Sequence, residues 1–510
     1  MSLVHRLVAA LFILSLTISA SLAAPAVTAA PAAGPPTTKI LVSGTGYGAF
    51  AAIDVYFDTA HLCLAFASGT GVASCTITVP KEAQPQLHWI SMLQRNAGTG
   101  AQRPFTVRTD MAQFHGRNAA HNGVNPFENT LNVSNVGDLD TLWSQPIGPS
   151  GTNGSAVVAG GKVYVGGVDG KLYAFSAVNG APVAGFPVNV GAAIDVSTPA
   201  AGGGRVFIGG NDSKLHAYNA ATGAAVAGFP VTLGTIVQST PSLALGNVYV
   251  GCNDGKLYAF NATTGVPVPG FPVIVTVGGV VYASPTVVSG KVYIGGANAF
   301  SALQAFDALT GAAVPGFPIN TGFNQFNTTV AASGATGFFG QDPFTLLGFR
   351  LANGVFTPGF PLTTPGAIFG SPAIAGGKVY VGWDNSGFSA YSTTGGSPVW
   401  TKTLESNARG SPMVANGVVY TSTSNRLYAL SAATGAILWS ADATSIGIGF
   451  NSPVVADGIL YYASANGNLY AFTVNGQAPA SRLAGGALGV KPSLSRLTPD
   501  LSLKAVRTPD

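Results

Sequence analysis

Residues 239–272 read STPSLALGNVYVGCNDGKLYAFNATTGVPVPGFP, and this stretch decides the fold. Residues 248–250 and 257–260 are runs of β-branched and aromatic side chains, which favour strands. Between them lies NDGK, and Asp-Gly is a strong hairpin signal because glycine tolerates positive φ. A second turn at Thr264-Gly265 precedes an outer strand at residues 268–273. Four antiparallel strands in about 42 residues are typical of one propeller blade.

Copies of this stretch recur along the chain. Eight units follow one another at spacings of 40 to 45 residues, and all but the fifth, which has Asn327, open on a serine. These serines are Ser155, Ser197, Ser239, Ser284, Ser371, Ser411 and Ser452. One unit cannot bury both faces of its sheet, whereas units arranged radially bury a core between neighbours. The sequence therefore predicts an all-β fold with an eight-bladed propeller over residues 139–476, in which the fifth unit is the least regular.

The two ends of this region complement each other. The last unit ends at Gly476 with no outer strand after it, and residues 139–146 (LDTLWSQP) form an outer strand with no unit before it. Trp143 in that strand corresponds to Trp400 and Trp439 in later units. We therefore predict that residues 139–146 complete the last blade and close the ring without a free edge.

The units resemble a known repeat. Thr-Gly after the Tyr-Ala-Phe strand, followed by Val-Trp or Ile-Leu-Trp, is similar to the pyrroloquinoline quinone (PQQ) repeat, over residues 139–476. The resemblance implies a propeller with one of two roles. Quinoprotein dehydrogenases hold PQQ and calcium at the channel, whereas cofactor-free scaffolds include the lipoprotein subunit of the outer-membrane β-barrel assembly machine. The lipid-anchoring cysteine of that subunit has no counterpart here.

The residues that a dehydrogenase of this type needs are not assembled in the sequence. Such an enzyme requires a carboxylate base, oxygen ligands for calcium and a cation over the quinone. There is no Cys-Cys pair, Glu405 is the only glutamate after Glu128, and Trp383 is the one propeller tryptophan away from an outer strand. We therefore expect no catalytic residues, no metal and no cofactor. The alternative is a PQQ- and calcium-dependent dehydrogenase of alcohols or sugars.

Other catalytic chemistry is also excluded by the sequence. Asp169 and Asp254 belong to Asp-Gly turns, where a turn role outweighs metal binding. The blades contain one histidine, His216, so a Ser-His-Asp triad or a histidine-rich metal site is not available there. The favoured function is a non-catalytic binding or scaffolding protein of the cell envelope or the outside of the cell. Its partner is a protein or an extracellular ligand.

Specificity is expected where the repeat varies. Two residues before each opening position, the side chain changes from unit to unit, and such positions on a regular scaffold form binding sites. Ordinary loop variation is the alternative interpretation. The positions are Asn153, Asp195, Val237, Tyr282, Gln325, Phe369, Arg409 and Phe450. We predict that they surround the mouth of the channel.

The N-terminus and the composition indicate export. His5 and Arg6 precede an apolar run at residues 7–22 and a small-x-small motif, so residues 1–23 are predicted to be a signal peptide. The protein is then secreted, periplasmic or on the cell surface. A net charge of +4 with only 8% charged residues gives no basic face, which excludes nucleic acid as a partner. We expect a monomer with no membrane span after signal cleavage.

The remaining segments flank the propeller. Residues 24–38 are predicted to be a flexible Ala/Pro/Thr-rich linker, and residues 39–109 a small β-sandwich that resembles bacterial immunoglobulin-like modules. Cys63 and Cys75 are expected to form a disulfide across one hairpin, and Cys252 to be a buried thiol.

Two further segments complete the chain. Residues 110–138 connect the sandwich to the propeller, and His115 and His121 within them are expected to be structural rather than metal ligands. Residues 477–510 are predicted to be a mobile tail, with a short docking strand at 501–503 as the alternative.

Overall fold

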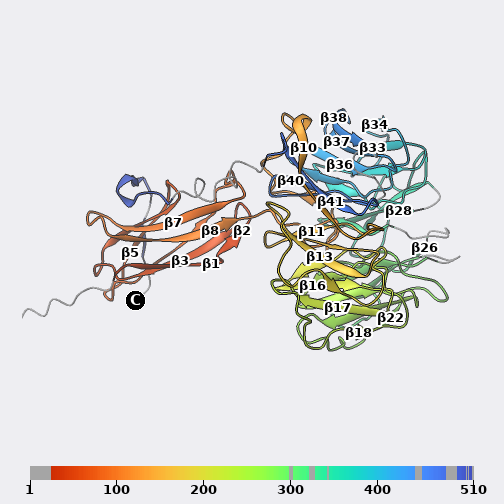
Figure 1. The fold of residues 1–510 in the computed structure, drawn as a ribbon, viewed down its shortest axis with the longest axis horizontal. Helices are drawn as coiled ribbons and strands as arrows, with labels where there is room; N and C mark the ends of the chain where they lie inside the picture. The colour runs from red at the N-terminus through yellow and green to blue at the C-terminus, as the bar shows by residue number, and fades with distance from the viewer. Residues whose placement is uncertain are drawn as a thin grey trace, which may run out of the picture.

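The computed structural model describes residues 24–297, 302–320, 328–341, 344–442, 451–477, 491–500, 502–503 and 505–507. The predicted signal peptide lies outside the described residues. The described residues form a β-sandwich and a larger ring of small sheets (Figure 1). Among them, no helix is long and apolar enough to cross a membrane.

The sandwich consists of two sheets around one core. The three-stranded sheet has the order β1 (Ala26–Ala30), β3 (Lys39–Thr45) and β6 (Ala73–Thr78). The six-stranded sheet has the order β2 (Ala33–Gly34), β8 (Gly100–Val107), β7 (Leu87–Gln94), β4 (Ala52–Phe57), β5 (Ala60–Phe66) and β42 (Ala505–Arg507). Val42 and Ile77 from one sheet pack with Val55 and Phe105 from the other. The immunoglobulin-like relationship of this module stays a prediction.

Both chain ends contribute strands to this sandwich, which corrects two predictions. The predicted linker contains β1 and β2, because an edge strand needs only backbone pairing and its Ala/Pro-rich composition does not prevent that. In the predicted mobile tail, β42 pairs in parallel with β5, and Leu497 packs on Tyr56 and Leu93. The docked strand lies at residues 505–507 rather than at 501–503. Figure 1 shows a blue part of the chain, from near its C-terminus, beside the orange sandwich.

The disulfide also differs from the predicted arrangement. Cys63 and Cys75 are bonded, with 6.7 Å between their Cα atoms. They lie on β5 and β6, which belong to different sheets, so the bond connects the two layers instead of two strands of one hairpin. Cys252 is a buried free thiol, as the sequence predicts.

The propeller is built of sheets with four blade strands each, here called blades one to eight, and β9 adds a fifth strand to the sheet of blade seven. The innermost strands are β11 (Val157–Ala159), β15 (Ala200–Gly202), β19 (Ser242–Ala244), β23 (Thr286–Val288), β27 (Ala331–Ser333), β31 (Ala373–Ala375), β35 (Met413–Ala415) and β39 (Val454–Ala456). The second strands are β12 (Lys162–Gly166), β16 (Arg205–Gly209), β20 (Asn247–Gly251), β24 (Lys291–Gly295), β28 (Thr336–Gln341), β32 (Lys378–Trp383), β36 (Val418–Ser422) and β40 (Ile459–Ala463).

The outer half of each blade follows the same order. The third strands are β13 (Lys171–Ser176), β17 (Lys214–Asn219), β21 (Lys256–Asn261), β25 (Ala302–Asp307), β29 (Thr345–Arg350), β33 (Gly387–Ser392), β37 (Arg426–Ser431) and β41 (Asn468–Val474). The outer strands are β14 (Val188–Asn189), β18 (Val231–Thr232), β22 (Val273–Ile274), β26 (Ile319–Asn320), β30 (Leu362–Thr363), β34 (Trp400–Thr403), β38 (Ile437–Asp442) and β10 (Leu139–Pro146). Two short 3-10 helices lie at Val136–Asp138 and Leu494–Arg496.

The N-terminal strand closes the ring, as the sequence predicts. β10 pairs antiparallel with β41, so residues from the two ends of the propeller share one sheet. Trp143 on β10 is buried and packs on Tyr461 of the last blade, with 5.9 Å between the ring centroids. The last blade is therefore completed by a strand that precedes the first blade in the chain.

Residues 110–125, here called the connector, contact every innermost strand in chain order. The carbonyls of Met111, Ala112, Ala119, Ala120, Asn122 and Gly123 accept the amides of Val158, Ala201, Val287, Ala332, Ile374 and Val414. On β19, Gln113 bonds both the amide and the carbonyl of Leu243. On β39, Asn125 donates to the carbonyl of Val455. β9 (Val124–Asn125) also pairs with β35. The connector therefore satisfies backbone groups that otherwise line the channel unpaired.

The two histidines of the connector hold its course. The ring nitrogens of His115 contact the carbonyls of His121 and Pro412, and those of His121 contact the carbonyls of Phe114 and Pro285 and the hydroxyl of Ser242. Both side chains are buried. These contacts fit the expected structural role, and the described residues contain no group of three or more potential metal ligands.

Candidate binding site at the channel mouth

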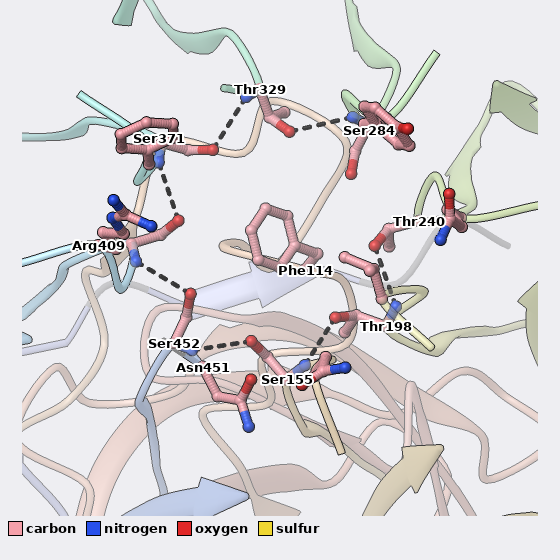
Figure 2. A pocket seen from close by; sticks show the side chains of 16 residues that line it. Phe114, Ser155, Thr198, Thr240, Ser284, Thr329, Ser371, Arg409, Asn451 and Ser452 are labelled. Atoms are coloured by element: carbon pink, nitrogen blue, oxygen red, sulfur yellow. Dashed lines mark hydrogen bonds between the residues drawn. The ribbon is translucent and has the colours of Figure 1, made fainter. Parts of the chain in front are cut away.

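The channel contains a ring of hydroxyl side chains, one from each blade. Each member lies three residues before the residue of the innermost strand that bonds the connector. The members are Ser155, Thr198, Thr240, Ser284, Thr329, Ser371, Ser411 and Ser452, and all of them line one pocket. Phe114 of the connector lies at the centre of this hydroxyl ring (Figure 2).

Hydrogen bonds link the members of the ring from blade to blade. The amide of one member donates to the hydroxyl of the next, as in Ser371 to Ser411 at 2.9 Å and Ser411 to Ser452 at 3.1 Å. The same link joins residues 155 to 198, 198 to 240, 284 to 329, 329 to 371 and 452 to 155. Among the described residues, no such link joins Thr240 to Ser284. The hydroxyls are therefore fixed in position everywhere except at the Ser284 side chain.

The hydroxyl ring corrects the alignment of three units. In blades two, three and five the ring hydroxyl comes from Thr198, Thr240 and Thr329. The sequence instead predicts Ser197, Ser239 and Asn327 as the opening residues. Ser197 and Ser239 instead accept the amides of Gly209 and Gly251 within their own blades. The predicted mouth residues shift accordingly by one position in blades two and three, to Val196 and Gln238, and both of these line the pocket.

The predicted mouth residues fall in four different places. Asn153, Tyr282, Phe369 and Arg409 line the pocket as expected. Asp195 lies beside it, accepting hydrogen bonds from Asn153 and Gln238, whereas Val237 is buried in the core between blades. Gln325 and Phe450 lie outside the described residues.

One wall of the pocket is aromatic and carries a neutralised cation. The Arg409 guanidinium lies over the Phe369 ring, 4.3 Å from its centroid, and donates to both carboxylate oxygens of Asp384 at 2.7 and 2.6 Å. The hydrogen bond to Asp384 raises the pKa of Arg409, so the guanidinium stays charged. Tyr282 is 40% exposed, and its ring is available at the pocket edge.

The opposite wall is a chain of amides around one carboxylate. Asn153 Nδ2 donates to Asp195 at 2.7 Å, and Gln238 Nε2 donates to the other oxygen of the same carboxylate at 3.0 Å. Asn253 donates to Gln238 Oε1 at 2.6 Å. This wall therefore spans blades one to three and is held by side chains alone.

The pocket opens on the end of the propeller away from the sandwich. The sandwich is attached at the opposite ends of the innermost strands, where Thr109 bonds Asp457 and Asp110 bonds the amide of Gly160. The pocket has a volume of about 230 Å³. The connector occupies the channel between these two ends, so the site is a cup with Phe114 at its centre.

The pocket residues do not fit a quinone with calcium. Among the described residues that line the pocket there is no carboxylate, and the carboxylate of the adjacent Asp195 accepts hydrogen bonds from two amides. Glu405 pairs with Arg426 at 3.0 Å, and Trp383 is buried in a core cluster between blades. Asp169 and Asp254 accept hydrogen bonds from Tyr173 and Tyr258 and from amides of their own turns.

Comparison with known proteins gives one family and many structural relatives. The family model described as outer membrane protein assembly factor BamB matches residues 133–357, 243–441 and 359–482. No curated protein sequence matches the chain. BamB from Moraxella catarrhalis is similar in structure, with a TM-score of 0.55 and 19% identity, covering 66% of this chain and 97% of that one.

Two other solved structures show how widely this fold is used. Quinohemoprotein alcohol dehydrogenase from Comamonas testosteroni has a TM-score of 0.60 and 17% identity, covering 73% of this chain and 81% of that one. The computationally designed protein Ika8 has a TM-score of 0.55 and 13% identity, covering 66% and 99%. At these identities the likeness shows the fold alone. The family match extends over more than half of the chain, which therefore belongs to the BamB family of PQQ-like repeat β-propellers.

Proposed function

We propose that this protein is an exported, non-catalytic propeller that binds a ligand or partner at the mouth of its channel. The observation that carries the proposal is the cup itself. Its hydroxyl ring is the same in every blade, while the residues around it differ from blade to blade. A constant ring with a variable rim is the arrangement expected of a recognition site on a repeat scaffold.

The chemistry of the cup supports binding over catalysis. A dehydrogenase needs a base within reach of the substrate hydroxyl, and the lining residues that the structure describes include neither a carboxylate nor a histidine. The position of the sandwich also supports a scaffold role. This module is attached at the end of the propeller away from the mouth, so it does not cover the mouth. The disulfide between the sandwich sheets is consistent with an oxidising compartment.

Reconstitution tests the non-catalytic role. The mature chain, residues 24–510, is equilibrated with PQQ and calcium, desalted, and assayed for bound quinone and for dye-linked oxidation of alcohols and sugars. We expect no retained quinone and no turnover. Stoichiometric quinone with turnover would instead establish the dehydrogenase alternative.

Export is tested separately. Intact-mass measurement of protein recovered from the exported fraction of the producing cell should give a chain that starts after residue 23. Recovery of only the full-length chain inside the cell would contradict export.

A further inference from the structure

The hydroxyl ring presents both donors and acceptors to the cavity. A hydroxyl has one proton and two lone pairs, and each linked member spends one lone pair on a neighbouring amide. Among the described residues, none of the linked hydroxyls donates to a protein atom. Each therefore keeps a proton and a lone pair for a ligand. This dual capacity matches a ligand that is itself rich in hydroxyl groups.

The charges around the cup favour a neutral ligand. Within the part of the lining that the structure describes, Arg409 is the one charged residue, and it forms a two-pronged ion pair with Asp384. Asp195 at the rim is held by the amides of Asn153 and Gln238. A phosphate or carboxylate ligand would need to compete with Asp384 for Arg409, and a cation would need to displace two amides from Asp195.

Aromatic surface completes the chemistry of the cup. Phe114 lies at its centre, as Figure 2 shows, and Tyr282 and Phe369 also line it. The faces of aromatic rings carry negative partial charge and attract the weakly positive C–H groups of a saturated ring. A sugar ring offers such C–H groups on its faces and hydroxyls around its circumference. The cup therefore offers aromatic faces to the C–H groups and the hydroxyl ring to the hydroxyls of such a sugar.

The size of the cup limits how much of a ligand it encloses. Its volume of about 230 Å³ is smaller than the roughly 300–1,000 Å³ typical of pockets for drug-sized ligands, which fits about one sugar ring. We propose that this pocket binds one neutral pyranose ring, either as a free sugar or as the terminal residue of a glycan. The proposal rests on the non-catalytic binding function proposed above and names its ligand class.

Ligand-observed NMR and calorimetry on the mature chain test this proposal. The probes are the methyl glycosides of glucose, galactose, mannose and N-acetylglucosamine, followed by a trisaccharide ending in the best of them. We expect saturation transfer to at least one neutral glycoside. Equal affinity for the glycoside and the trisaccharide indicates a free sugar, whereas tighter binding of the trisaccharide indicates the end of a glycan. Sodium glucuronate and inorganic phosphate serve as charged probes.

Ser284 and Tyr282 provide the decisive variants. The Ser284 hydroxyl lines the pocket and accepts no amide of the ring, so Ser284→Ala removes a ligand contact without breaking a link. We expect two- to tenfold weaker binding, about the value of one neutral hydrogen bond. Tyr282→Ala removes an exposed aromatic face and should weaken binding about three- to tenfold. Ser333→Ala at the opposite end of β27 and Phe50→Ala on the sandwich are the matched controls.

The outcomes separate this proposal from the proposed function. No transfer to any neutral glycoside, or preferential binding of phosphate or glucuronate, overturns the saccharide proposal and leaves the non-catalytic role intact. Glycoside binding that Ser284→Ala and Tyr282→Ala leave unchanged also overturns it, because the ligand would then lie elsewhere. Uptake of PQQ with turnover overturns the proposed function, whatever the glycosides do.

Discussion

The backbone amide of Ser452 donates a hydrogen bond to the Oγ of Ser155, 3.0 Å away, although the two residues are 297 positions apart in the chain. This bond joins the last blade to the first at the channel, and the pairing of β10 with β41 joins them at the outer edge. The ring is thus closed twice, at its inner and outer circumferences.

Ser155→Ala should destabilise this seam. The substitution leaves the buried amide of Ser452 without its acceptor, which costs about 1–3 kcal/mol. Ser284→Ala at the equivalent position of blade four is the matched control, because its hydroxyl holds no amide of the ring. We expect the control to stay within about 0.5 kcal/mol of the wild type. Chemical denaturation followed by tryptophan fluorescence measures both, and equal effects would show that the link at the seam contributes nothing.

Gln113 should be the most sensitive side chain of the connector. It is buried and bonds both the amide and the carbonyl of Leu243, so Gln113→Ala leaves two backbone groups of β19 without partners. We expect a loss of about 1–3 kcal/mol in the free energy of unfolding. Asn118 in the same segment is exposed, and Asn118→Ala should cost less than about 0.5 kcal/mol. Thermal denaturation in which the two variants melt together would show that the connector does not stabilise the ring.

The blades were predictable because each unit carries its own local signals. Asp254-Gly255 fixes a hairpin between two strands, and the spacing of units then implies a ring. Closure was predictable because Trp143 repeats the pattern of Trp400 in a strand that lacks its own unit. The prediction of the blades and of ring closure depends only on side-chain patterns, which can be read directly from the sequence.

The connector could not be predicted in the same way. Most of its bonds to the innermost strands use the carbonyls of residues such as Met111 and Ala119, and any residue type supplies a carbonyl. The alignment of blade two was wrong by one residue for a related reason. Ser197 and Thr198 both carry hydroxyls, and the sequence does not show which of the two belongs to the hydroxyl ring. The hydrogen bond between the connector and Ala201 decides between them, and it is seen only in the folded structure. The number of residues before the β-branched second strand would have been a better guide to the position of the ring hydroxyl.

The covalent framework gives a direct chemical prediction. With Cys63 bonded to Cys75, the non-reduced mature protein should show one reactive thiol after denaturation, and mass spectrometry should place the alkylated cysteine at Cys252. Three thiols in protein from an oxidising compartment would contradict the disulfide. The double variant Cys63→Ala, Cys75→Ala should lose about 2–4 kcal/mol of sandwich stability. A melting transition of the propeller at an unchanged temperature is the internal control.

His115 should make the stability of the connector fall in acid. Burial lowers the pKa of His115 to about 4, below the usual value of 6.5, so the folded state holds the ring neutral. Between pH 6.5 and 4 the unfolded chain binds more protons, and stability that is complete above pH 6.5 is lost as the pH falls. The loss reaches about 3 kcal/mol for a shift of this size.

A comparison with His115→Gln isolates this effect. Burial raises the pKa of Asp110 and Glu128 nearby, and these carboxyl groups stabilise the fold as the pH falls, opposite in sign to His115. Their contribution is common to wild type and variant. Denaturation at pH 7, 6, 5 and 4 should therefore show a smaller acid loss for the variant, and parallel curves would exclude His115 as the source.

Ring closure by β10 is tested by truncation and by one substitution. All chains end at residue 477, because the segment beyond it docks on the sandwich. A chain starting at residue 110 loses the sandwich but keeps the connector and β10, and it should melt as the intact propeller does. A chain starting at residue 147 loses both segments and exposes the edge of β41, so we expect aggregation.

Trp143→Ala in the chain from residue 110 isolates the contribution of the strand from that of the connector. Because Trp143 is 8% exposed and packs on Tyr461, its truncation should cost about 3–5 kcal/mol, a large share of the stability of a typical domain. Chains from residues 110 and 147 that melt alike, or a Trp143→Ala variant as stable as its parent, would show that the ring closes without this strand.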